Sequence, residues 1–302
     1  YHALSANTTA SNNTAIGRGA LQINTTGHSH VAVGKGSLDA NTTGAQNVAV
    51  GESALGANTT ASFNTAVGEN ALATNTTGAQ NVAVGQAALD TNTTGSGNTA
   101  VGRDAMTANT TASNNTALGL SALTANTTGT GNTAVGMRSQ RVGTTGDNNT
   151  SIGKDTLYTN TTGEFNTALG NNALEGNTTA DNNTSVGYNS MKANTTGTVN
   201  VAVGAETLQA NTTANHNAAF GYRALKANTT GTLNVALGSN ALVSNTTASN
   251  NAAIGYASLG ANTTGSTNSA LGVASLSTNT TGASNVAVGY QSLKLATTAS
   301  NN

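Results

Sequence analysis

The sequence predicts an all-β protein, a parallel β-solenoid of about 18 coils with 17 residues in each coil. Glycine stands at every multiple of 17, from Gly17 to Gly289, without an insertion or deletion. Each copy also carries a short β-rich segment and a Thr-Thr turn, preceded by Asn in 16 copies, and a copy of this length is too short to fold alone. We therefore treat residues 1–302 as a single repeat domain in which each coil pairs with the coils above and below.

The remainder of a residue number after division by 17 is called its phase here, so that Gly51 has phase 0 and Glu52 has phase 1. The segment Asn-Thr/Val-Ala-Val at phases 13 to 16 predicts a strand that ends at the phase 0 glycine. Ala-Leu at phases 3 and 4 predicts the start of a second strand, and Asn-Thr-Thr-Gly at phases 7 to 10 predicts a turn. Helices are disfavoured because every copy contains Gly, Thr and Asn. The pattern fits a coil with two or three sides.

Charge follows the same period. All 21 charged residues fall at phases 1, 2, 5 and 11, which predicts that these phases face solvent. Asn occupies phase 13 in every copy except at His30, and we interpret this row as a ladder of stacked amides.

The two faces of the predicted strand are both restricted. Side chains alternate along a strand, so Val or Thr at phase 14 and Val, Ile or Leu at phase 16 share one face, while Asn at phase 13 and Ala at phase 15 share the other. A lone solenoid needs only one fixed face, so the small residue predicts close contact with a second subunit, and Ala49→Leu is expected to disrupt assembly. The candidate subunit interface comprises Ala15, Ala32, Ala49, Ala66, Ala83, Ala100 and Ala202.

Composition excludes several classes of function. A net charge of −1 gives no electrostatic footprint for nucleic acid, and no apolar run is long enough to span a membrane. The absence of Cys excludes disulfides and thiol chemistry, and no catalytic, metal or cofactor set can be assembled, so we expect a protein that is not an enzyme and has no cofactor.

A disordered low-complexity chain is the competing interpretation of the composition, but a disordered chain does not require its apolar residues to keep a strict register.

The segments Asn47-Val48-Ala49-Val50-Gly51 and Asn200-Val201-Ala202-Val203-Gly204 resemble the head repeat of trimeric autotransporter adhesins, and similar repeats occur in bacteriophage tail fibres. The resemblance covers nearly the whole chain, although the repeat here is longer and contains the additional Asn-Thr-Thr-Gly. It implies a left-handed parallel β-roll, a homotrimer and a location outside the cell, at the cell surface or in a virion fibre. Open coil ends would also allow chains to stack axially into a filament.

These observations predict a non-enzymatic extracellular structural fibre or filament that serves as the spacer or display shaft of a surface appendage. The alternative is an adhesin head or tail-fibre segment that binds a target on a host surface. Tyr188, Tyr222, Tyr256 and Tyr290 recur every 34 residues at phase 1, which favours binding unless a recent two-repeat duplication explains it. An ice-binding solenoid is less favoured because the consecutive Thr at phases 8 and 9 should point to opposite faces.

The Asn-Thr-Thr row also matches the N-glycosylation sequon, so the fibre could carry glycans. Because both Thr persist where Gly143 and Ala296 replace Asn, a turn with a Thr ladder is the competing interpretation. The candidate glycosylation sites are Asn7, Asn24, Asn41, Asn58, Asn75, Asn92, Asn109, Asn126, Asn160, Asn177, Asn194, Asn211, Asn228, Asn245, Asn262 and Asn279.

Three further features have a functional and a plainer interpretation. Glu52 and Glu69 lie one coil apart, as a glycosidase pair could, but they occupy a solvated phase. His28 and His30 could share a strand face and bind a metal, but no acidic ligand accompanies them. The coil at 137–149 breaks three rules of the repeat, with Gln140 for Leu, Gly143 for Asn and two nearby arginines, either by local drift or as a partner site.

Overall fold

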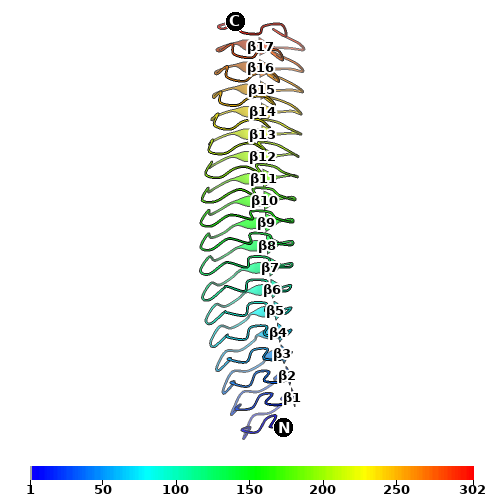
Figure 1. Cartoon of the computed structure of the whole chain (residues 1–302), viewed down its shortest axis with the longest axis vertical. Coiled ribbons are helices and arrows are strands. Elements are labelled where there is room, and N and C mark those ends of the chain that lie inside the picture. The colour runs from blue at the N-terminus through cyan, green and yellow to red at the C-terminus, as the bar shows by residue number, and fades with distance from the viewer. Residues whose placement is uncertain (1) are drawn as a thin grey trace. The chain divides into compact units, whose positions relative to one another are not determined.

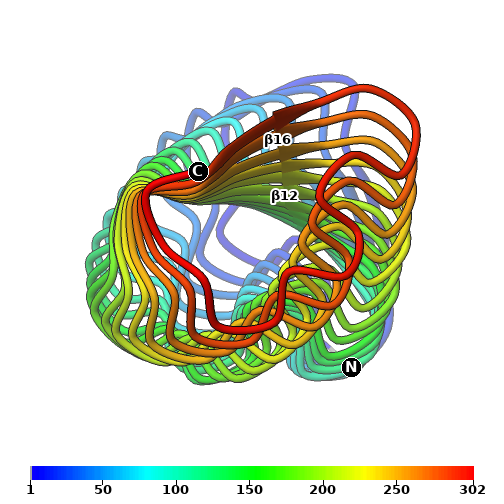
Figure 2. The same cartoon turned by 90° about the horizontal axis from the view of Figure 1, so that it is seen from above.

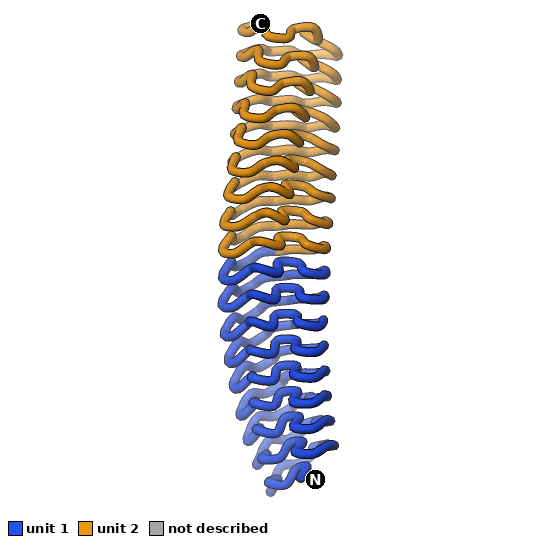
Figure 3. The backbone as a smooth tube through the Cα atoms, viewed as in Figure 1, with its two compact units in different colours: residues 1–149 blue, residues 150–302 orange. Residues whose placement is uncertain are grey.

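The computed structural model describes residues 2–302, which form two compact units, one ending at Asn149 and the other covering 150–302 (Figure 3). Each unit is a stack of coils with one strand in each coil (Figure 1). The first unit contains β1 (Thr14–Ile16), β2 (Val31–Val33), β3 (Val48–Val50), β4 (Thr65–Val67), β5 (Val82–Val84), β6 (Thr99–Val101), β7 (Thr116–Leu118) and β8 (Thr133–Val135). The second contains β9 (Thr150–Ile152), β10 (Thr167–Leu169), β11 (Thr184–Val186), β12 (Val201–Val203), β13 (Ala218–Phe220), β14 (Val235–Leu237), β15 (Ala252–Ile254), β16 (Ser269–Leu271) and β17 (Val286–Val288).

Within each unit, every strand pairs in parallel with the strand of the next coil. The register equals one repeat: Ala32 is opposite Ala49 between β2 and β3, and Ala202 is opposite Ala219 between β12 and β13. The strands of the second unit stack on one side of the coil, as β12 and β16 show in Figure 2, and turns form the remainder. The predicted parallel β-solenoid with a 17-residue repeat is confirmed.

The core of each unit is narrow and repetitive. In the first unit it consists of rows of fully buried Ala and Leu such as Ala49, Ala54 and Leu55, at phases 15, 3 and 4. The second unit repeats these rows with Ala202, Thr207 and Leu208. Only the phase 4 residue is large, so it fills the space enclosed by the coil and leaves room only for Ala, or for Ser at Ser151 and Ser185, at phase 15.

The glycine at phase 0 is required by its conformation and by a close contact. Gly51 has φ of +137°, a region that side chains rarely adopt, and a Cβ added there would lie 2.5 Å from the carbonyl oxygen of Gly68 in the next coil. The glycine row therefore sets both the bend after each strand and the close approach of successive coils.

The second strand expected at Ala-Leu does not form. Phases 1 to 6 are turns, and the phase 4 residue is left-handed in every coil, with φ of 50° at Leu55. Coil-to-coil hydrogen bonds nevertheless continue through this segment, for example from the Leu55 N–H to the Ala71 carbonyl at 3.0 Å. Burial of the leucine and these bonds outweigh the cost of a left-handed residue, which is about 1–2 kcal/mol.

Candidate functional site

The outward side of the strands, formed by the residues at phases 14 and 16, carries an apolar row at phase 16 in both units. We call it the apolar strand face. In the first unit Ile16, Val67 and Leu118 are more than a third exposed, and in the second unit Leu169, Leu237 and Leu271 are more than two-fifths exposed. Phase 16 is apolar in all 17 strands, and no charge occurs at phases 13 to 16 anywhere in the chain. Such a continuous surface is unusual in a protein without a partner.

The alanines predicted to form the subunit interface lie on the side of the strand that faces the interior of the coil. Ala32, Ala49, Ala66, Ala83, Ala100 and Ala202 are fully buried in the core of their own unit, and Ala15 is partly buried against it. The expectation that these alanines contact a partner is therefore corrected. Their size is restricted by the narrow coil interior, whereas the larger Val, Ile and Leu point outward and supply the surface available to a partner.

The sequon asparagines at phase 7 form a buried ladder. The amide nitrogen of Asn92 donates to Asn75 Oδ1 at 2.8 Å and to the Gly95 carbonyl at 2.9 Å, and Asn92 Oδ1 accepts from Asn109 Nδ2 at 2.9 Å. The same pattern repeats in both units, and the row is buried from Asn24 to Asn279. These residues satisfy the polar groups of the turn from within the coil.

This geometry overturns the glycosylation prediction for the row Asn7 to Asn279. A glycan would have to attach to Nδ2, which is buried and already donates two hydrogen bonds in most copies, as at Asn92. Only Asn7, in the first coil, is partly exposed. The competing interpretation, a turn with a Thr ladder, agrees with the contacts, because phase 8 hydroxyls donate to the phase 8 carbonyl of the next coil, as Thr76 does to Thr93 at 3.0 Å.

A second amide ladder lies at phase 13, as the sequence predicts. Asn47 Nδ2 donates to the Ala61 carbonyl at 2.8 Å, and Asn47 Oδ1 accepts from the Asn64 N–H at 2.9 Å. The two ladders meet at the phase 10 carbonyl, since Asn58 Nδ2 also donates to Ala61 at 3.0 Å. The asparagines at phases 7 and 13 therefore stabilise the coils through hydrogen bonds of their side-chain amides.

The two threonine rows differ in exposure. The phase 9 row, which includes Thr60 and Thr77, is exposed, whereas the phase 8 hydroxyls are occupied by the ladder. A flat ice-binding surface uses two parallel outward rows of hydroxyl groups, and these turns present one.

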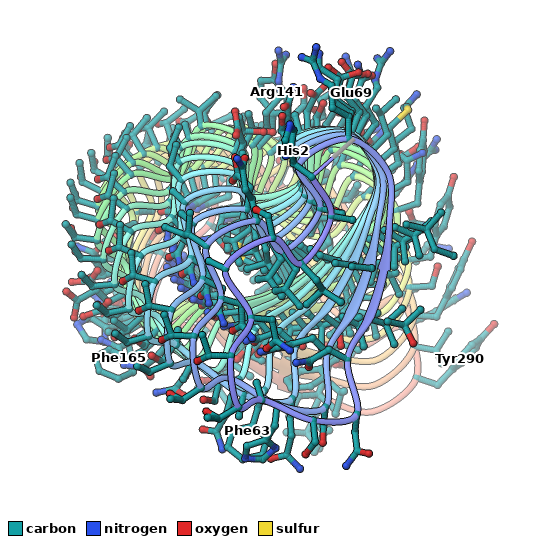
Figure 4. All side chains as sticks on the ribbon, turned by 90° about the horizontal axis from the view of Figure 1, so that it is seen from below. His2, Phe63, Glu69, Arg141, Phe165 and Tyr290 are labelled. Carbon is teal, nitrogen blue, oxygen red and sulfur yellow. The ribbon has the colours of Figure 1, made fainter. Side chains whose placement is uncertain are left out.

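Most charged side chains of the first unit occupy phases 1, 2 and 5, and Figure 4 shows Glu69 and Arg141 on the same side of the coil as His2 and opposite Phe63. Lys35 Nζ lies 2.5 Å from Glu52 Oε1, and this hydrogen bond lowers the pKa of the Glu52 carboxyl. Glu69 Oε2 accepts from Gln86 Nε2 at 3.3 Å. A glycosidase acid needs a raised pKa, so the pairing of Glu52 does not suit that role.

The two histidines do not form a common site. His30 is buried at a phase 13 ladder position, where Nδ1 accepts from the Asn47 N–H at 3.2 Å and Nε2 donates to the Gly44 carbonyl at 2.7 Å. His28 is exposed beside Ser29. Both ring nitrogens of His30 are occupied, and burial lowers its pKa. Among residues 2–302, no group of three or more His, Asp or Glu side chains is placed to hold a metal ion.

The irregular coil at 137–149 keeps the turns of the other copies. Gln140 is buried at the leucine position, and its Nε2 donates to Asn132 Oδ1 at 3.3 Å. Gly143 interrupts the phase 7 ladder and leaves Asn126 Oδ1 buried without a hydrogen-bond partner. The departures at Gln140 and Gly143 thus have local structural consequences inside the coil.

No protein-family model matches the chain, and no curated protein has significant similarity to it. The described part of the chain contains no helix that is long and apolar enough to cross a membrane.

Proposed function

We propose that the chain is a non-enzymatic structural subunit of an extracellular fibre, which self-associates side by side through the apolar strand face. The observation that carries the proposal is the outward apolar residue at phase 16 in every strand of both units, beside an uncharged Val, Thr, Ala or Ser at phase 14. A second copy of the same chain is the partner that matches this surface best, because it presents an equally long face with the same spacing.

Burial of this face would supply the driving force for assembly. Transfer of apolar surface from water is worth roughly 25 cal/mol per Å². The face has no charged group that would lose its hydration on association, whereas the charged phases 1, 2, 5 and 11 lie elsewhere on the coil. The location outside the cell, the spacer role and the homotrimer rest on the resemblance of Asn-Val-Ala-Val-Gly to adhesin head repeats. Axial stacking stays a prediction.

Sedimentation velocity of the purified chain tests self-association and gives the number of chains. We expect a species larger than one chain, three chains if the resemblance holds. Val67→Lys with Val84→Lys places two charges on the apolar strand face and should yield single chains with an unchanged circular dichroism spectrum. Thr60→Lys with Thr77→Lys adds the same charges to the exposed turn of the same coils and should assemble as before. A wild-type chain that sediments as a monomer would refute the proposal.

A further inference from the structure

The second unit carries a regular row of exposed tyrosines at phase 1. Tyr188, Tyr222, Tyr256 and Tyr290 are 54%, 45%, 57% and 75% exposed. They alternate with Ala205, Ser239 and Val273, which occupy phase 1 in the intervening coils. With strands stacked about 4.8 Å apart, consecutive tyrosines are separated by two coils, or roughly 9–10 Å. The row thus offers four exposed aromatic rings at a constant interval, with a smaller side chain between each pair.

Neighbouring side chains hold some of these rings in place. The Arg223 guanidinium lies 4.7 Å from the centre of the Tyr222 ring and is itself held by Glu206, with Nε 2.8 Å from Oε2. Gln291 Nε2 donates to the Tyr290 hydroxyl at 3.0 Å. Ordered aromatic rings lose little conformational entropy when a ligand covers them.

A largely apolar groove with several polar side chains runs through the coils that also carry Tyr188 and Tyr222. It has a volume of about 570 Å³ and is lined by phase 5 and 6 residues that include Glu175, Lys192, Gln209 and Lys226. Lys226 Nζ is 2.7 Å from Glu206 Oε2, the carboxylate that also holds Arg223 beside Tyr222. The surface therefore combines aromatic platforms with amide, carboxylate and ammonium groups that can bond hydroxyls.

We propose that this surface binds a neutral, extended β-1,4-linked polysaccharide laid along the tyrosine row. The apolar C–H face of a pyranose ring stacks on an aromatic ring, and in a β-1,4-linked chain every second sugar presents the same face. This two-sugar repeat matches a two-coil interval, whereas α-linked chains curl away from a linear row. Lys192 is paired with Glu175, and Lys226 and Arg223 share Glu206, so most of the positive charge beside the row is engaged by carboxylates, which favours a neutral ligand over a polyanion.

A second copy of the chain is a poorer occupant of this row. In the first unit phase 1 carries Arg18, Lys35, Glu52, Glu69 and Arg103, and all five are exposed. An interface that ran along phase 1 would remove water from these charges, which is costly. Polysaccharide binding is therefore independent of the self-association proposed above, and either can fail without the other.

Adsorption of the full chain to microcrystalline cellulose, crystalline chitin and granular starch tests the proposal. We expect retention on cellulose or chitin, whichever sugar the row prefers, and none on starch. The chain contains no Trp and four of its six tyrosines form the row, so tyrosine fluorescence titrated with cellohexaose and chitohexaose reports mainly on the row. Failure to adsorb to both β-linked polymers, or equal retention on starch, would overturn the proposal.

A variant that preserves composition tests the interval itself. Tyr222→Ser with Ser239→Tyr keeps four tyrosines but breaks the two-coil spacing, and should weaken binding roughly tenfold or more. Phe165→Ala removes an equally exposed but isolated aromatic ring and should leave binding unchanged. Sedimentation of both variants should match that of the wild type. Wild-type affinity in the swapped variant would overturn the proposal.

Discussion

The side-chain oxygen of Asn126 is buried without a hydrogen-bond partner, because Gly143 stands one coil further on, where nearly every other copy supplies an asparagine amide. Asn279 Oδ1 lacks a partner for the same reason, since Ala296 follows it at phase 7. Both copies without the sequon asparagine therefore leave a defect in the ladder. This relationship shows that the asparagine is conserved within the repeat for the hydrogen bonds that its side chain makes.

Gly143→Asn should repair the first defect. The new amide would donate to Asn126 Oδ1, and a satisfied buried hydrogen bond contributes about 1 kcal/mol to the free energy of unfolding. Gly143→Ala is the matched control, because it changes the backbone entropy without supplying a donor. Urea denaturation of both variants checks the prediction, which is wrong if Asn is no more stabilising than Ala.

Asn92→Ala should have the opposite effect. It removes two donated bonds and leaves Asn109 Nδ2 and Asn75 Oδ1 each with one partner fewer, at a cost of about 1–3 kcal/mol for a buried group left unsatisfied. Thr94→Ala, two residues later on the exposed phase 9 row, should change the free energy of unfolding by less than about 0.5 kcal/mol. Equal losses in the two variants would argue against the ladder.

Peptide mass spectrometry of native material should find no glycan on the phase 7 asparagines, because Nδ2 is buried in the folded coil. Peptides that contain Asn75 and Asn92 are suitable, as both residues are fully buried. A sugar on either residue in folded native protein would contradict the structure at that position.

Ala49→Leu should destabilise the single chain directly. Ala49 is fully buried, and extra methyl groups in a packed core cost about 1–3 kcal/mol. Val50→Leu, on the neighbouring outward position, should leave the free energy of unfolding nearly unchanged. Thermal melting at a concentration where the chains are dissociated separates this effect from assembly. An unaltered melting temperature for Ala49→Leu would restore the sequence-based interpretation of that row.

His30 should make the first unit less stable in mild acid. Burial lowers its folded pKa below the ordinary value of 6.5, so the unfolded chain binds more protons in the interval between the two values. The contribution is complete above pH 6.5 and is lost as the pH falls toward the folded pKa. Asp39 and Asp90, whose pKa values burial raises, act in the opposite direction.

Comparison with His30→Asn isolates this effect, because Asn restores the ladder residue and leaves both aspartates in place. Melting temperatures at pH 7.5 and pH 5.5 should differ more for the wild type than for this variant. His28→Asn, at an exposed position, should behave as the wild type. The same pH difference in all three proteins would remove His30 as its cause.

The repeat could be predicted from the sequence because its strictest residues are required by geometry that admits few alternatives. Gly51 needs positive φ and close coil contact, and the Asn47 side chain bonds two backbone groups of the next coil, the Ala61 carbonyl and the Asn64 N–H. The left-handed turns could not be predicted in the same way. Val199 and Thr267 occupy φ of 57° and 60° at phase 12, although β-branched residues disfavour this region. Only the surrounding coils force them into it.

Which face of the strand points into the coil could also not be predicted from the sequence. Alternation alone assigns Ala49 and Val50 to opposite sides without saying which side is interior. Larger apolar residues are usually buried, yet here Leu55 already fills the coil, so the alanine row turns inward and the valine row outward. The restriction of phase 4 to Leu or Met in all but one copy was the available signal, since one large residue per coil suffices for so narrow a core.

Cysteine cross-linking tests the central claim, lateral assembly through the apolar strand face, most directly. The chain has no Cys, so Val67→Cys and Thr60→Cys each introduce a single thiol into the same coil, the first on the face and the second on the exposed turn. Under mild oxidation, we expect Val67→Cys to form disulfide-linked dimers rapidly and Thr60→Cys to remain uncrosslinked. Slow or equal cross-linking of the two variants would contradict the account.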